Sequence, residues 1–168
     1  MFTKLATERL SLDALTAEDG GFIVELFNTK GWLQFIGDRN IHSKEEAIDY
    51  INKINATPNF YYWAVRRTDT LEPIGVISFI KRDYLEHFDI GFAFLPQYIG
   101  KGYAHEAAEE VLSVVRSKPE HAFIMAITMP GNTSSIKLLQ KLGLQFEKEI
   151  EVGDEKLQVY SYAVSCKR

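Results

Sequence analysis

The spacing of apolar residues predicts strands and helices along the first third of the chain. Residues 7–15 alternate between apolar and polar positions, as in a strand with one buried face. Residues 16–36 place apolar side chains at helical spacing and predict a helix that is broken near Gly31. Ser43 followed by Glu46 has the spacing of a capping box, and the apolar residues after it recur at helical spacing. We therefore expect a strand followed by two helical segments.

The middle of the chain changes to three segments rich in aromatic and β-branched residues. These segments are FYYWAVRR from Phe60, IGVISFIKR from Ile74 and HFDIGFAFL from His87, and turn-like sequences separate them. They predict three consecutive antiparallel strands. One face of the third strand is aromatic or aliphatic, whereas the opposite face has the small or polar residues of a ligand-lined surface: His87, Asp89, Gly91 and Ala93.

The last third of the chain completes the predicted element order. Residues 122–129 form a nearly continuous apolar run that is typical of a strand buried on both faces. Residues 131–142 predict a short helix, and residues 144–152 and 156–164 predict a closing hairpin. The order is β-α-α-β-β-β-α-β-α-β-β, which belongs to the mixed α/β (α+β) class. Because the chain has 168 residues and no repeat or linker-like tract, we expect one domain over residues 1–168.

A glycine-containing loop precedes a segment with a full apolar stripe at helical spacing. Gly100 and Gly102 flank Lys101 directly before apolar residues that recur at helical spacing. Unpaired backbone N–H groups and the positive end of the helix dipole meet there, and the missing side chains would let a pyrophosphate approach the backbone. A tight turn alone is the alternative. The loop lacks the third glycine of dinucleotide-binding proteins and the G-K-S/T of P-loops, so another phosphate-bearing ligand is indicated.

Charge and composition narrow the classes of partner. The formal net charge is −4, so we expect no nucleic acid as a partner, and a cationic substrate is weakly favoured. No apolar run approaches the roughly 20 residues of a membrane span, so we expect no membrane association and a cytoplasmic location. The lone Cys166 is interpreted as a residue without a catalytic role, and the four histidines lack the spacing of a metal site.

Two motifs resemble the GNAT superfamily of N-acetyltransferases, and within it the RimJ/RimL-like branch. The acetyl-CoA loop of that branch has the form Q/R-x-x-G-x-G/A, and QYIGKG from Gln97 matches every defined position. The segment GNTSSIKLLQKLGL from Gly131 is similar to the asparagine-containing segment and helix of the same branch. The resemblance extends over nearly the whole chain in element order. It implies a mostly antiparallel sheet whose two parallel strands, near residues 89–95 and 122–129, splay apart.

The resemblance also implies acetyl-CoA as co-substrate and a place for each part of it. The pantetheine arm would lie in the gap between the splayed strands, against the backbone of Phe92, Ala93 and Phe94. Asn132 would hydrogen-bond the pantetheine, with the N-cap of the next helix as its alternative role. The pyrophosphate would rest on the loop and the helix start, formed by Gln97, Tyr98, Ile99, Gly100, Lys101, Gly102, Tyr103 and Ala104.

The catalytic residues implied by the resemblance are Ser135 and Asp89. Many GNAT enzymes place a tyrosine seven residues after the asparagine to meet the leaving thiolate, but that position is Leu139 here. Ser135 matches the RimL-like alternative for this role, unless it is an ordinary helix serine. Asp89 matches the strand carboxylate that serves as base, acting through a water or orienting the amine because it is shorter than glutamate. The other candidates are two acids that alternation places on one face and two histidines: Glu147, Glu149, His87 and His105.

These residues favour an N-acetyltransferase that acts on a primary amine, either a protein N-terminus or a small molecule. The N-terminal helices and residues 32–40 would shape the acceptor pocket, in which Asp38 and Glu86 could contact a cation. The alternative is a non-catalytic acyl-CoA-binding module that senses the cofactor or docks a partner. We expect a monomer or a homodimer.

Overall fold

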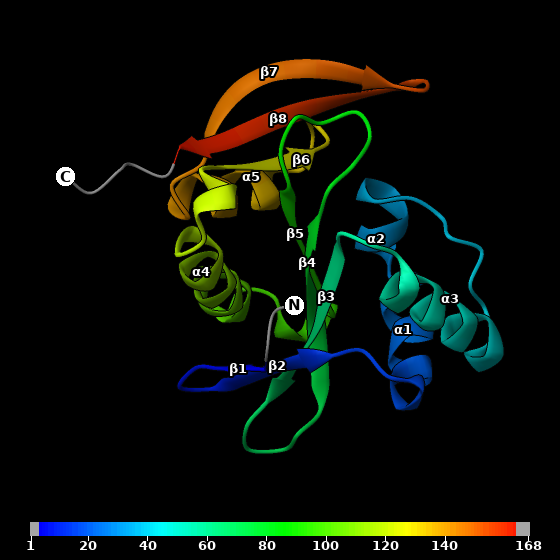
Figure 1. The fold of residues 1–168 in the computed structure, drawn as a ribbon. Coiled ribbons are helices and arrows are strands. Elements are labelled where there is room, and N and C mark those ends of the chain that lie inside the picture. The colour runs from blue at the N-terminus through cyan, green and yellow to red at the C-terminus, as the bar shows by residue number, and fades with distance from the viewer. Residues whose placement is uncertain (1–3, 164–168) are drawn as a thin grey trace.

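Within residues 4–163, which the computed structural model describes, eight strands form one open sheet with helices on both faces (Figure 1). The strand order is β1-β2-β3-β4-β5-β6-β8-β7. The strands are β1 (Leu5–Ala6), β2 (Leu10–Ala14), β3 (Phe60–Arg67), β4 (Pro73–Ile80), β5 (Asp89–Phe94), β6 (Phe123–Thr128), β7 (Gln145–Val152) and β8 (Glu155–Ala163). The helices are α1 (Gly20–Phe27), α2 (Lys30–Phe35), α3 (Lys44–Ala56), α4 (Tyr103–Arg116) and α5 (Thr133–Lys141).

The element order confirms the predicted fold class, with two corrections in the first third of the chain. The first strand is two short strands, β1 and β2, which pair with each other as an antiparallel hairpin. The break expected near Gly31 lies slightly earlier in the chain, because α1 ends at Phe27 with Asn28 as its C-cap. The Thr29 side chain accepts a hydrogen bond from the Trp32 N–H and caps α2, so the next helix begins at Lys30, one residue before Gly31.

The two faces of the sheet bury different sets of helices. In Figure 1, α4 and α5 lie on one face, whereas α1, α2 and α3 lie on the other. The α4 face encloses the larger apolar cluster. This cluster includes residues of the central strands, such as Ile77 of β4, Ile90 of β5 and Ile124 of β6. The α1–α3 face encloses a second cluster around Ile23 and Ile51. Alternation along each strand supplies both clusters at once.

The sheet opens between β5 and β6, its one parallel pair among the described strands. A single residue pair, Asp89 with Met125, joins these strands, and the Met125 N–H donates to the Phe88 carbonyl at 2.9 Å. From Asp89, β5 continues to Phe94 over about 17 Å without a further residue paired to β6, at the usual rise of a strand. The expected splay of the two parallel strands is therefore present, with its closed end at Asp89.

The closing hairpin contains a bulge that changes one expectation. The β7–β8 register shifts between Phe146 and Lys148, so Glu147 has no partner on β8. Glu147 and Glu149, which strict alternation would place together, line two separate surface hollows of about 360 and 240 Å³. The structure thus does not combine these acids in one site. Cys166 lies outside the described residues.

Candidate functional site

The glycine loop connects the end of β5 to the start of α4. After a 3₁₀ turn at Pro96–Tyr98, Gly100 and Gly102 both adopt left-handed backbone angles, with φ of 81° and 82°. L-residues with a side chain rarely adopt such angles, so both positions require glycine for conformation alone. A Cβ at Gly100 would meet no atom within 4 Å. Space beside the backbone therefore remains for a ligand, in addition to the tight turn.

Backbone donors converge in this loop. Within the described chain, the N–H groups of residues 100–105 have no backbone acceptor, and the first bond of α4 is donated by the Glu106 N–H to the Gly102 carbonyl. The amphipathic α4 is 14 residues long, and its dipole adds positive potential at the same end. Free N–H groups at a helix start are a general anion-binding arrangement. The loop has the donors for a phosphate group.

The predicted cofactor residues are placed around the loop and along β5. Phe94 is buried in the α4-side core, while Phe92 and Ala93 are half-buried. Their contribution to a bound arm would come from the strand backbone on the open edge. Tyr98, Tyr103 and Ala104 are half-buried, whereas the exposed members of the predicted set are Gln97, Ile99, Gly100, Lys101 and Gly102.

The segment after β6 faces the same edge of the sheet as the loop. Because β5 and β6 run parallel, their carboxyl ends lie at one edge, so Asn132 and the glycine loop flank the open end of the gap. The Asn132 Oδ1 accepts a hydrogen bond from the Ser135 N–H at 3.3 Å and caps α5. Ser135 is half-buried in the first turn of α5. Leu139 is 1% exposed and packs in the core, so the position of the missing tyrosine faces away from solvent.

Asp89 lies at the closed end of the gap and is almost inaccessible. Its side chain is 2% exposed, and its Oδ2 accepts a hydrogen bond from the Arg82 Nε at 2.8 Å in an ion pair. Burial raises the pKa of Asp89, and Arg82 opposes this without cancelling it. A carboxylate with a raised pKa is a better proton acceptor near neutral pH. No hydrogen bond or ion pair joins Asp89 to Ser135 in the described chain.

Arg82 and Tyr62 were not found from the sequence. Tyr62 lies on β3 in a cross-strand row with Ser78 and Gly91, on the face of the sheet that α1 and α3 cover. Burial raises the pKa of Tyr62 strongly, and Tyr50 of α3 adds to the shift, while Arg82 lowers it. Arg82 follows a strand in a turn-rich segment with no periodic pattern. Its role becomes visible only in the structure, where it forms an ion pair with Asp89, seven residues later.

The remaining candidates lie away from this constellation or on its rim. His87 stacks on Phe123 with ring centres 5.0 Å apart, and His105 is half-buried on α4. Asp38 and Glu86 are exposed. In the described part of the chain, no group of three or more His, Cys, Asp or Glu could hold a metal ion, and no helix is long and apolar enough to cross a membrane.

The fold and the loop now define the family. Acetyltransferase (GNAT) domains match residues 9–145 of the chain, which therefore belongs to the GNAT family of acetyltransferases. This confirms the family resemblance predicted from the loop and the asparagine segment. The chain is 31% identical over 151 residues to the uncharacterized N-acetyltransferase YoaA of Bacillus subtilis (strain 168), covering 88% of this chain and 85% of that protein.

Two solved structures share the fold. The ribosomal-protein-S5-alanine acetyltransferase of Vibrio fischeri has a TM-score of 0.78 and 19% identity, with 96% of this chain and 97% of that chain covered. The microcin C7 self immunity acetyltransferase MccE, in complex with acetyl-CoA and AMP, has a TM-score of 0.80 and 14% identity, with 94% and 93% covered. At these identities the likeness concerns the fold alone.

Proposed function

We propose that this protein transfers the acetyl group of acetyl-CoA to a primary amine, by direct attack of the amine in a ternary complex. The observation that carries the proposal is the set of free N–H groups at residues 100–105 next to the open edge between β5 and β6. Donors for a pyrophosphate and an unpaired strand edge for an amide-containing arm occur side by side. Pantetheine and pyrophosphate are joined in CoA in that order.

The cofactor would occupy the loop and the gap as follows. The pyrophosphate accepts hydrogen bonds from the backbone at Gly100, Gly102 and the start of α4. The pantetheine arm lies along the open edge of β5, and the Asn132 Nδ2, whose Oδ1 is used in the α5 cap, donates to it. The thioester would then lie in the gap between Asp89 and the start of α5, within reach of both Asp89 and Ser135. The acetyl-CoA in the structure of MccE, which shares the fold, supports this choice of cofactor.

The chemistry requires three proton movements or charge changes. A neutral amine attacks the thioester carbon, the carbonyl oxygen becomes an oxyanion, and the C–S bond breaks to release a thiolate. We assign the proton of the attacking amine to Asp89, through a water molecule because the carboxylate is 2% exposed. The Ser135 hydroxyl donates its proton to the thiolate and regains one from solvent. Asp89 releases the amine proton to solvent, so the proton count balances.

The acceptor would enter from the face of the sheet that α1 and α3 cover. Tyr62 and Ser78 lie on this face, next to Gly91, whose missing side chain leaves the Ser78 Oγ 2.6 Å from the place of a Cβ. A protein N-terminal amine and a small-molecule amine both fit this chemistry. The RimJ/RimL-like loop and the fold shared with the S5-alanine acetyltransferase support the inclusion of N-terminal peptides among the candidates.

The test is thiol release from acetyl-CoA with a panel of N-terminal peptides, polyamines, aminoglycosides and amino acids. We expect release that depends on the acceptor. Ser135→Ala should lower kcat about 100-fold, the scale of general acid catalysis, while calorimetry shows unchanged CoA affinity. Ser134→Ala is the matched control because Ser134 is an exposed serine in the same helical turn, and it should keep wild-type kcat.

A non-catalytic acyl-CoA-binding module is the second candidate. It is favoured by the buried Leu139 at the tyrosine position and by the ion pair that occupies Asp89. Tight CoA binding without turnover of any amine would support this module and contradict the enzyme. Absence of CoA binding would contradict both candidates.

A further inference from the structure

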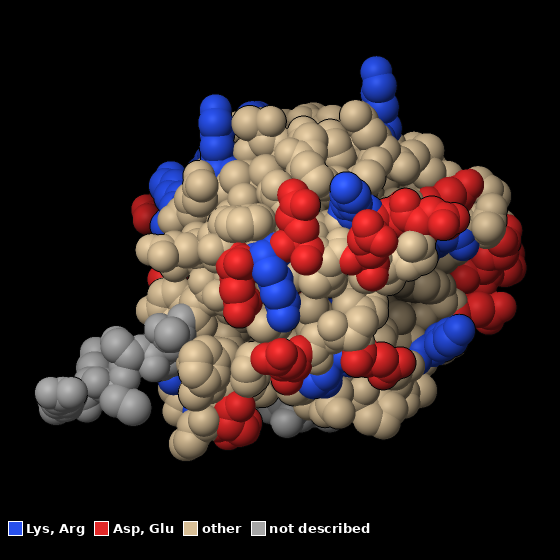
Figure 2. Space-filling view, turned by 90° about the horizontal axis from the view of Figure 1, so that it is seen from above, with Lys and Arg blue, Asp and Glu red and all other residues tan. Residues whose placement is uncertain are grey.

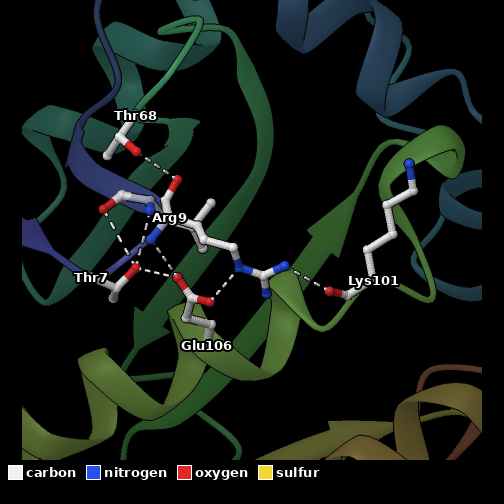
Figure 3. Close-up of polar contacts among 6 residues, drawn as sticks. Thr7, Arg9, Thr68, Lys101 and Glu106 are labelled. Carbon is white, nitrogen blue, oxygen red and sulfur yellow. Dashed lines mark hydrogen bonds and ion pairs between the residues drawn. The ribbon is translucent and has the colours of Figure 1, made fainter.

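The N-terminal hairpin meets the glycine loop through one arginine. Arg9 directly precedes β2, yet its side chain reaches across to the start of α4 (Figure 3). The Arg9 Nε donates to the Glu106 Oε1 at 2.8 Å, and the Arg9 Nη1 donates to the Lys101 carbonyl at 3.1 Å. The guanidinium carbon also lies 4.3 Å from the centre of the Tyr103 ring. The cation is thus fixed by a carboxylate, a loop carbonyl and an aromatic face.

Glu106 in turn is fixed by the hairpin. Its Oε2 accepts hydrogen bonds from the Thr7 hydroxyl at 2.5 Å and from the Arg9 N–H at 3.1 Å, while the Thr68 hydroxyl and N–H hold the Arg9 carbonyl (Figure 3). Burial alone would raise the pKa of Glu106, but the Thr7 and Arg9 hydrogen bonds outweigh it and lower the pKa. Glu106 therefore stays ionised, and it orients Arg9.

One arm of the guanidinium remains available. The Arg9 Nη2 lies 3.4 Å from the place where a Cβ on Gly102 would be, and it donates to no acceptor among residues 4–163. The neighbouring N–H groups of residues 100–105 are the free donors of the loop. The Lys101 side chain points away from Arg9 in Figure 3. Arg9 thus presents a cationic donor beside the same backbone that would receive the pyrophosphate.

We propose that Arg9 is a cofactor-binding residue: Glu106 and Lys101 hold its guanidinium, and its Nη2 donates to the pyrophosphate of CoA beside Gly102. This inference rests on the proposed acetyl-CoA site. Arginine suits the role because its planar fork satisfies fixed partners and a phosphate at the same time, which a lysine ammonium does not. Preorganisation by Glu106 and Tyr103 also means that little side-chain freedom remains to be lost on binding.

The chain offers a closely matched control at the other end of α4. Arg116 pairs with Glu109 at 3.1 Å and lies 4.6 Å from the centre of the Tyr162 ring, so it repeats the arginine, glutamate and tyrosine arrangement away from the loop. Arg116→Gln removes the same kinds of contact as Arg9→Gln. Melting temperatures report the structural effect of each substitution, and calorimetry with CoA reports the effect on binding.

Arg9→Gln should weaken CoA and dephospho-CoA about 10- to 100-fold alike, since a hydrogen bond to a charged group is lost and both ligands keep the pyrophosphate. Arg116→Gln should leave both affinities within twofold of wild type. Acetyl-pantetheine, which lacks phosphate, should bind wild type and Arg9→Gln equally. Arg9→Lys, which keeps the charge without the fork, should weaken CoA binding several-fold, and it serves as the test if Arg9→Gln does not fold.

Each other result contradicts the proposal in a distinct way. Equal CoA affinity of wild type and Arg9→Gln, or an equal loss in Arg116→Gln, would overturn it. A loss for CoA that is absent for dephospho-CoA would move the contact to the 3′-phosphate and overturn the assignment to the pyrophosphate. A wild-type protein that binds no CoA would overturn the proposed function itself, which separates that failure from the failure of Arg9 alone.

Discussion

Asn132 combines an observed role in the fold with a proposed role in binding, and two substitutions separate them. Its Oδ1 caps α5 by accepting from the Ser135 N–H, and the Nδ2 is assigned to the pantetheine. Asn132→Asp keeps the cap, because aspartate is an equally good N-cap, but removes the donor. We expect unchanged stability and about 3- to 10-fold weaker CoA binding, measured by urea unfolding and calorimetry. Asn132→Ala should also lose about 1 kcal/mol of stability.

The ion pair of Arg82 with Asp89 leads to a prediction about how the stability of a variant depends on pH. Arg82→Met leaves a buried carboxylate without its cation and should cost about 3–5 kcal/mol at neutral pH. The pKa of Asp89, already raised by burial, then rises further. The folded state holds the proton more tightly than the unfolded chain, whose pKa is about 3.9, so stability falls as pH rises between the two pKa values. Urea unfolding of Arg82→Met should therefore show more stability at pH 5 than at pH 8.

The control for this pH effect removes the charge. Adding Asp89→Asn to Arg82→Met should recover much of the lost stability and flatten its dependence on pH, because no buried group ionises. A single Arg82→Met variant with the same unfolding midpoint at both pH values would contradict the assignment of the loss to the unpaired carboxylate.

At the scale of the elements, substitution of alanine for glycine should have opposite effects on stability at two positions. A Cβ on Gly75 of β4 would lie 2.4 Å from the Phe94 ring and 2.7 Å from the Ala93 carbonyl. Gly75→Ala should therefore destabilise by about 1–3 kcal/mol or more through overpacking. A Cβ on Gly31 of α2 meets no atom within 4 Å, and Gly31→Ala should stabilise by about 0.5–1 kcal/mol. Chemical denaturation of both variants measures the contrast, and a stabilising Gly75→Ala would contradict the described β4–β5 packing.

The edge strand β7 is protected by charge. It pairs only with β8, and its exposed side chains include Glu147, Lys148, Glu149 and Glu151. Figure 2, which looks down on the molecule from above, shows groups of acidic side chains with basic side chains between them. Charged side chains on an edge oppose pairing with another strand, and the bulge at Glu147 twists the edge further from that geometry. The charge pattern was readable in the sequence, but the bulge was not.

Elements with strong periodicity were predictable, and elements set by local side-chain bonds were less so. The helix after Gly102 and the three strands from Phe60 follow from apolar spacing alone. The break before α2 does not, because it depends on the Thr29 hydroxyl rather than on the more conspicuous Gly31. The residues at which α1 ends and α2 begins could therefore be located only in the structure.

At the scale of the whole molecule, the gap between β5 and β6 predicts where CoA changes hydrogen exchange. Peptides that cover residues 91–105 should gain protection at short exchange times when CoA is added, because backbone groups on the open edge and in the loop acquire acceptors. Peptides from β2 and β3, which are paired on both sides, should change little. Mass spectrometry of the exchanged peptides measures this, and an effect confined to β2 and β3 would contradict the proposed cofactor seat.

The sequence predicted which loop should carry the cofactor site, but not which side chains hold that loop and Asp89 in place. The QYIGKG motif and the GNTSS segment are local and could be recognised directly. Arg9 and Glu106 are 97 residues apart, and Arg82 acts only through a turn that folds back onto Asp89. Such pairs have no spacing rule, since tertiary packing alone brings them together. The two local motifs therefore indicated the candidate site, whereas the ion pairs of Arg9 with Glu106 and of Arg82 with Asp89 were visible only in the structure.

The single residue pair between β5 and β6 also concerns the lifetime of the protein in a cell. Because one residue pair joins these strands, we expect the segment beside the glycine loop to open more easily than the rest of the sheet and to be accessible to a protease. A cofactor that hydrogen-bonds along that edge would close it and reduce the population of the cleavable form. With the proposed cofactor site, the rate at which a protease cleaves this protein would then fall as CoA is added.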